Sequence, residues 1–192
     1  MHFATFALVA VSICSVFAAP STIDRRSAIL DAALTAVNTA NATVANQLSI
    51  IVQGVFNLPV VQASLTNIAT AIGGATSAVT PITNVALPLT NAELNVLLGL
   101  TDGVGDIESN VQNALNDILT TVPSLTGVFV KAQALAVLAT IGPLTTPVTQ
   151  FANSAIAGTT GPLTTAIQSS IASITSITSS LLGPILTAVL AL

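Results

Sequence analysis

The stretch of sequence that decides the fold is residues 162–181, PLTTAIQSSIASITSITSSL. Its large apolar residues recur at steps of three and four, and the positions between them hold mainly Ser, Thr, Gln and Ala. They are Leu163, Ile167, Ile171, Ile174, Ile177 and Leu181. A repeat near 3.6 residues places such side chains on one face of an α-helix, whereas a β-strand requires strict alternation. These residues therefore predict an amphipathic helix.

The same spacing occurs through most of the chain before this stretch. The first set follows Ser27 and is predicted to end before Pro59: Leu30, Leu34, Val37, Val44, Leu48, Ile51 and Val55, with Asn41 in the one vacant position. A second set runs from Val61 to Val79 and is weakened by Gly73-Gly74, which can divide it into two helices. We therefore predict an all-α fold, a bundle of five to seven amphipathic helices.

Local signals predict where further helices begin and end. Thr90-Asn91-Ala92-Glu93 has the pattern of a capping box, so a short helix is expected to run from it to about Leu100, and another to begin near Asp102. Glycine suits the end of one helix and proline the first turn of the next, so a Gly-Pro pair predicts a helix boundary. Three such pairs lie in the C-terminal third, at 142–143, 161–162 and 183–184.

The N-terminus predicts a secreted protein. Residues 1–18 have the pattern of a signal peptide, because the apolar run Phe3–Phe17 has the length of a signal-peptide core and is too short to span a membrane. Cleavage is expected after Ala18, where small or aliphatic residues precede the cut.

A short polar segment follows the leader. Residues 19–26 are predicted to be a pro-segment or a flexible N-terminus with a dibasic processing site at Arg25 and Arg26, and two solvated arginines are the alternative. Residues 27–192 are predicted to form a single helical domain, since a chain of this length can bury one hydrophobic core.

The amino-acid composition excludes most kinds of catalysis. Beyond the leader the chain has no His, Cys, Met, Trp or Tyr, so it can form no disulfide and lacks the usual proton shuttles and thiol nucleophiles. Asp102, Asp106 and Glu108 are assigned to the start of a helix, with a calcium site as the alternative. We expect no catalytic residue, no metal site, no cofactor and no enzymatic activity.

Charge is scarce: 5% of residues are charged and 52% are hydrophobic. If the dibasic site is cut, Lys131 is the only basic side chain left against six acidic residues, so nucleic acid and anionic membranes are poor partners. Ser, Thr, Asn, Gln and Ala must then cover the helices, which leaves a neutral, weakly hydrated exterior. Such residues also interrupt every candidate membrane span after the leader.

Two modifications are considered. Residues 169–180, rich in Ser and Thr, precede the apolar tail 181–192, which is the outline of a glycolipid-anchor signal, although a final bundle helix explains the same residues. Asn41-Ala42-Thr43 is a glycosylation sequon, but Asn41 lies on the predicted buried stripe, where a glycan would oppose packing.

A leader, a dibasic site and cysteine-free amphipathic helices rich in Ala, Thr, Ser, Leu and Val, from Ser27 to roughly Thr140, resemble fungal secreted proteins of the hydrophobic surface-binding protein A and cell-wall galactomannoprotein type. The resemblance implies a helical protein that coats hydrophobic surfaces or the cell wall, and in some members holds a fatty acid in an apolar cavity. This chain has fewer charges than that family, adds the Gly-Pro-punctuated C-terminal third, and offers no signature residue to transfer.

Three hypotheses about function follow. In the first, the secreted protein binds hydrophobic surfaces, lipids or the extracellular layer, including cell-wall polysaccharide, through amphipathic helices. In the second, the bundle carries a fatty acid or sterol in an apolar cavity lined by Phe56, Phe129 and Phe151, which can equally be core residues. In the third, the chain self-associates as a structural matrix protein.

Overall fold

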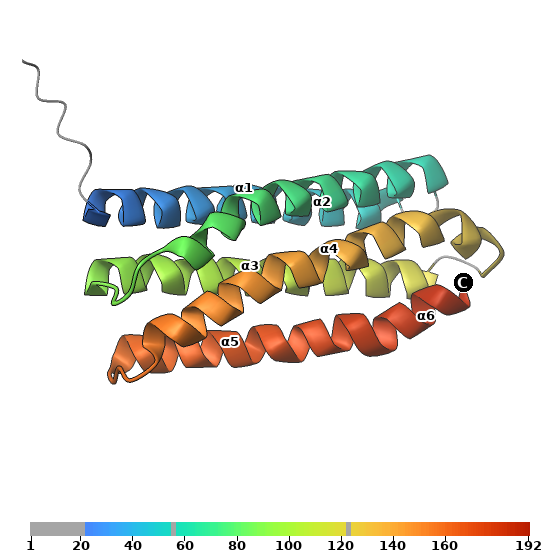
Figure 1. Cartoon of the computed structure of the whole chain (residues 1–192). Coiled ribbons are helices and arrows are strands. Elements are labelled where there is room, and N and C mark those ends of the chain that lie inside the picture. The colour runs from blue at the N-terminus through green and yellow to red at the C-terminus, as the bar shows by residue number, and fades with distance from the viewer. Residues whose placement is uncertain (1–21, 55–56, 122–123) are drawn as a thin grey trace, which may run out of the picture.

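The computed structural model describes residues 22–54, 57–121 and 124–192, and these are almost entirely helical (Figure 1). The predicted all-α bundle is therefore confirmed. Its elements in chain order are α1 Thr22–Gly54, α2 Leu58–Val79, the 3-10 helix η1 Thr80–Asn84, α3 Asn91–Thr121, α4 Ser124–Ile156, α5 Pro162–Ser180, the π-helical η2 Leu181–Ile185 and α6 Leu186–Ala191.

The helices form two antiparallel pairs and one further rod. Helix α1 packs on α2 and α3, and α4 packs on α2 and α3, which makes a four-helix unit. Helix α5 contacts α3 and α4, and it continues through η2 into α6, so that residues 162–191 form one rod. Figure 1 shows this rod on the side of α3 and α4 that faces away from α1 and α2. It is therefore an edge helix laid on a four-helix unit.

The predicted apolar stripes supply the core. Leu30, Val37, Val44 and Ile51 of α1 are fully buried, whereas Leu34 and Leu48 are only partly buried. In the edge rod every second stripe position is buried and those between are partly exposed; the buried ones are Ile167, Ile174 and Leu181. Only part of the apolar stripe of the rod is therefore buried.

Helix α3 corrects one prediction. The capping box at its start is confirmed, since Thr90 N donates to Glu93 Oε2 at 2.8 Å and Glu93 N donates to Thr90 Oγ1 at 3.3 Å. The expected break near residue 101 is wrong, because α3 runs on to Thr121. Gly103 lies inside it where α1 approaches closely: a Cβ atom there would lie 2.7 Å from Val37 Cγ1. This glycine therefore permits helix contact instead of ending a helix.

Only one of the three Gly-Pro pairs lies at a helix boundary as predicted, at the start of α5. Gly158 and Gly161 have φ values of 75° and 142° in the turn between α4 and α5, and Pro162 begins α5. Helix α4 continues through Pro143 and Pro147, and Pro184 lies in the π-helical turn η2. The wider π-helical turn has room for the ring of Pro184. In α4, the buried side chains around Pro143 and Pro147 hold the helix together. Gly73-Gly74 likewise leaves α2 unbroken.

The N-terminal boundary also differs from the prediction. Helix α1 begins at Thr22, so residues 22–26 are helical and not an irregular segment, whereas removal of residues 19–26 as a pro-segment stays a prediction. The leader and its cleavage position at Ala18 lie outside the described residues, and both stay predictions.

Candidate functional site

The edge rod combines high apolar content with little burial. Residues 162–192 contain no Asp, Glu, Lys or Arg. By length and composition alone, two helices could cross a membrane: Pro162–Ala191, with 22% of its most apolar stretch buried, and Phe129–Ile156, with 39% buried. Core helices of soluble proteins have the same composition because they are buried on several sides. The edge rod has it while lying at the surface.

Large apolar side chains are exposed at the end of the bundle where this rod finishes. Val52, Phe129, Leu182 and Leu190 are 55%, 61%, 42% and 54% exposed, and we call them the apolar end. They come from the last turn of α1, the start of α4, η2 and α6, which gather at one end of the molecule (Figure 1). The apolar end therefore adjoins the uncharged rod.

Two hydrogen bonds tie these elements together. Gln62 Nε2 of α2 donates to the carbonyl oxygen of Phe129 at 2.6 Å, and Lys131 Nζ donates to the carbonyl oxygen of Leu190 at 2.6 Å. The last carbonyls of a helix lack partners within the helix and carry partial negative charge, which suits an ammonium group. Lys131 therefore fixes the end of α6 to α4.

The three phenylalanines do not gather around one cavity. Phe151 is 5% exposed and borders an open groove of about 360 Å³ with Val85 and Leu87. Phe129 lies 22 residues earlier on α4, roughly 33 Å away at 1.5 Å per residue, and points outward. Phe129 is thus not part of an interior lining, and Phe56 lies outside the described residues.

Five depressions between about 280 and 710 Å³ are all open to solvent. The largest lies between α3 and α5 and is bordered by Asp102, Asp106 and several serines as well as by Leu98 and Ile177. A fatty-acid site is normally an enclosed, mainly apolar pocket. In these five depressions no such pocket is preformed.

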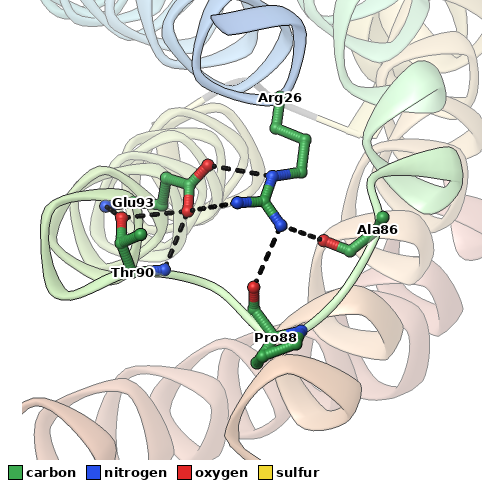
Figure 2. Close-up of polar contacts among 5 residues, drawn as sticks. All are labelled: Arg26, Ala86, Pro88, Thr90 and Glu93. Atoms are coloured by element: carbon green, nitrogen blue, oxygen red, sulfur yellow. Dashed lines mark hydrogen bonds and ion pairs between the residues drawn. The ribbon is translucent and has the colours of Figure 1, made fainter. Parts of the chain in front are cut away.

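Arg26 of the dibasic pair is held by tertiary contacts (Figure 2). Its Nε lies 3.3 Å from Glu93 Oε1, and its Nη1 donates to the carbonyl oxygens of Ala86 at 3.2 Å and Pro88 at 3.1 Å. Burial would raise the pKa of Glu93, but hydrogen bonds from Thr90 and the charge of Arg26 outweigh it and lower that pKa. Arg26 thus joins the start of α1 to the segment before α3.

Glu108 is fully buried where α3, α4 and α5 meet. Thr145 of α4 and Thr178 of α5 both form hydrogen bonds with its carboxyl group. Burial raises the pKa of Glu108, although the two threonine hydroxyls act in the opposite direction. Glu108 is therefore a core carboxyl group that contacts three helices.

The carboxylates of α3 do not form a metal centre. Asp102 and Asp106 lie on the exposed side of α3, and the described part of the chain contains no group of three His, Cys, Asp or Glu residues placed to hold a metal ion. Their assignment to the start of a helix is also wrong, because α3 begins eleven residues before Asp102.

Asn41 is half-buried between α1 and α3. Its Nδ2 donates to Asp106 Oδ2 at 3.4 Å, and its Oδ1 accepts from Asn110 Nδ2 at 3.0 Å. A glycan would be attached to the same Nδ2 and would replace one of its hydrogens. The side chain is therefore engaged in packing two helices.

Comparison with known proteins identifies no family. No family model matches the chain, and no curated protein matches it. Among solved structures, the crystal structure of AFMP4P in complex with palmitic acid is similar with a TM-score of 0.49 and 16% identity, over 85% of this chain and 99% of that chain. At this level the similarity carries no conclusion about the ligand of this chain.

Proposed function

We propose that the protein is secreted, has no enzymatic activity, and binds hydrophobic surfaces through the edge rod and the apolar end. The observation that carries this proposal is the edge rod itself, which has no charged residue and buries only 22% of its most apolar stretch. The signal-peptide pattern of residues 1–18 supports secretion.

Transfer of apolar side chains from water to the hydrophobic surface supplies the binding free energy. Full burial of a Leu, Val or Phe side chain contributes about 1.5–3 kcal/mol, so the half-exposed residues of the apolar end contribute about 1 kcal/mol each on a surface. The rod adds its partly exposed isoleucines, Ile171 and Ile177. Because these elements carry no charge apart from Lys131 nearby, binding should depend little on salt.

Two observations support surface binding over a fatty-acid carrier and over an enzyme. A carrier needs an enclosed apolar site, and the described depressions are open, so its helices would have to separate before a fatty acid could enter. Catalysis by carboxylates needs two such groups that face a common substrate. Glu93 is paired with Arg26, and Glu108 lies in the core. Asp102 and Asp106 border one depression, but both are exposed and so lack the opposed environments that an acid and a base need.

Adsorption to alkyl-coated beads tests the proposal, with surface tension at the air–water interface as a second measurement. We expect adsorption that is nearly equal at low and high salt, and a loss of about tenfold in affinity in the double variant Phe129→Gln, Leu190→Gln, equivalent to about 1.4 kcal/mol. Ile23→Gln is the matched control, because Ile23 is 53% exposed at the opposite end of α1. The proposal is wrong if the protein leaves surface tension unchanged and is not retained on the beads.

A further inference from the structure

Glu108 contacts the edge rod through one side chain. Thr178 Oγ1 of α5 lies 2.9 Å from Glu108 Oε1 and 3.0 Å from Oε2. On the opposite side, Thr145 Oγ1 of α4 contacts Glu108 Oε1. The carboxyl group is 0% exposed, so it bridges the four-helix unit and the rod without access to water.

The hydrogen bonds around Glu108 can be satisfied in either protonation state, but only the protonated form places no net charge in the core. Thr145 has one hydroxyl proton, and the carbonyl oxygen of Ile141 lies 2.9 Å from its Oγ1. A protonated Glu108 can donate to Thr145 Oγ1, Thr145 can then donate to Ile141, and Thr178 can donate to the second carboxyl oxygen. Each of the three protons then has an acceptor.

Within residues 22–54, 57–121 and 124–192, no cation faces Glu108 to stabilise its ionised form. The rod and η2 have no titratable side chain. The only charged residue of α4, Lys131, lies fourteen residues before Thr145, roughly 21 Å along the helix, and is bound to Leu190. Both of the other basic residues, Arg25 and Arg26, lie in the first turns of α1.

The acidic groups nearby are separate from Glu108. On α3, Asp102 is exposed, Asp106 accepts from Asn41 on the α1 side, and Asp117 lies more than two turns further on. Helix α1 contributes Asp31, which lies six residues before Val37, the residue that packs against Gly103. An ionised Glu108 would therefore be an unpaired charge in the core, which is strongly unfavourable.

Few polar contacts hold the rod on the four-helix unit. It is joined to α4 by a short turn that contains Gly158 and Gly161. Besides the contacts of Glu108, Gln112 Nε2 of α3 donates to Ser180 Oγ at 3.0 Å, and Lys131 Nζ of α4 donates to the carbonyl oxygen of Leu190 at 2.6 Å. Helices α1 to α4 contact one another without it. Its detachment would expose both Glu108 and the buried apolar stripe of the rod.

We propose that Glu108 is a proton-operated latch, which holds residues 162–191 against α3 and α4 while protonated and releases them to bind an apolar surface when the proton is lost. The rod is released in solution, without any surface. Binding of the released rod to an apolar surface rests on the proposed function.

The direction of the pH dependence follows from linkage. Burial raises the pKa of Glu108 in the closed state, so its contribution to docking is complete below the ordinary carboxyl pKa of about 4.3 and is lost as the pH rises through the raised value. One proton is released on opening. Between the two pKa values the open fraction should therefore increase up to about tenfold per pH unit.

Hydrogen–deuterium exchange of the full secreted protein, measured by mass spectrometry without any surface, tests the latch. Wild type and Glu108→Gln are compared at the same pH, because this cancels the pH dependence of chemical exchange. The glutamine amide can donate to Thr145 and accept from Thr178 as the protonated acid does. We expect residues 162–191 to exchange progressively faster in the wild type than in Glu108→Gln above about pH 4.3, while residues 91–121 stay protected.

Two further variants complete the test. Asp102→Asn removes an exposed carboxylate of the same helix and should behave like the wild type. Thr178→Val removes the hydroxyl on the rod and should speed exchange of residues 162–191 at acidic pH, where the latch is closed. Equal exchange in wild type and Glu108→Gln at every pH, or simultaneous loss of protection in all helices, overturns the latch.

Adsorption to alkyl-coated beads over the same pH range separates the latch from the proposed function. If the rod is released but the protein does not adsorb, the latch stands and surface binding fails. If adsorption of wild type and Glu108→Gln is equal at every pH, surface binding stands and the link to the latch fails.

Discussion

Arg26 in the second turn of α1 and Glu93 in the first turn of α3 form an ion pair with Nε 3.3 Å from Oε1, although 67 residues separate them in the chain. The side chain of Glu93 is only 3% exposed and also accepts from Thr90, so the capping box of α3 and the start of α1 share one carboxylate. This arrangement makes the stability of the N-terminal end of the bundle depend on a single charge.

Glu93→Gln should lower the free energy of unfolding by about 1–3 kcal/mol at pH 7, because Arg26 then loses its ionic partner. The lowered pKa of Glu93 in the folded state means that its contribution is present above the ordinary carboxyl pKa and is lost as the pH falls through the folded value. Urea unfolding at pH 7 and pH 3 measures the difference, which should shrink at pH 3. Asp31→Asn, an exposed carboxylate on α1, should have little effect at either pH.

Cleavage after Arg26 should be slow in the folded protein and faster in Glu93→Gln. A protease must unwind a helical site and draw the arginine into its own pocket, and here the guanidinium is bound by Glu93, Ala86 and Pro88. Limited trypsin digestion followed by mass spectrometry measures the rates after Arg26 and after Lys131, the latter serving as the internal control. If cleavage after Arg26 is equally fast in both proteins, the contacts do not protect the dibasic site.

Periodicity predicted the helices and most of the core, because burial of an apolar stripe is recorded directly in residue spacing. The same spacing places Glu108 on the buried face of α3, because it lies four residues after Val104 and three before Val111. The sequence alone does not indicate its partners, because Thr145 and Thr178 are brought to it by tertiary packing.

The positions of glycine and proline predicted helix ends less well than the apolar spacing predicted the helices. Glycine and proline lower helix propensity by about 1 and 3 kcal/mol, and the tertiary contacts of a long buried helix can outweigh such costs. Pro143 therefore stays inside α4, between the buried side chains of Ile141 and Leu144. The pair Gly161-Pro162 lies at a helix boundary, where Gly161 with a φ of 142° is the N-cap of α5 and Pro162 is its first residue.

Gly103→Ala and Gly74→Ala should change stability in opposite directions. The new methyl group at position 103 would lie 2.7 Å from Val37 Cγ1, so α1 and α3 must separate, at a cost of about 1–3 kcal/mol. At position 74 nothing lies within 4 Å, and alanine should stabilise α2 by about 0.5–1 kcal/mol. Thermal or urea unfolding of both variants measures this.

A double variant identifies the cause of the loss at position 103. Val37→Ala should destabilise the protein by itself, because Val37 is fully buried, yet it should cost less in the Gly103→Ala background, where it removes the clash. Additive losses would mean that the methyl group does not collide with Val37.

The secreted protein should begin at Ala19 and carry no glycan on Asn41. The Nδ2 of Asn41 donates to Asp106, and Asn110 donates to its Oδ1, so a glycan there would have to separate α1 from α3. Intact-mass measurement of protein secreted by a glycosylating host reports both features together. A mass decrease on treatment with an enzyme that removes N-linked glycans would contradict the packing of this side chain, and Asn41→Gln serves as the control that cannot be glycosylated there.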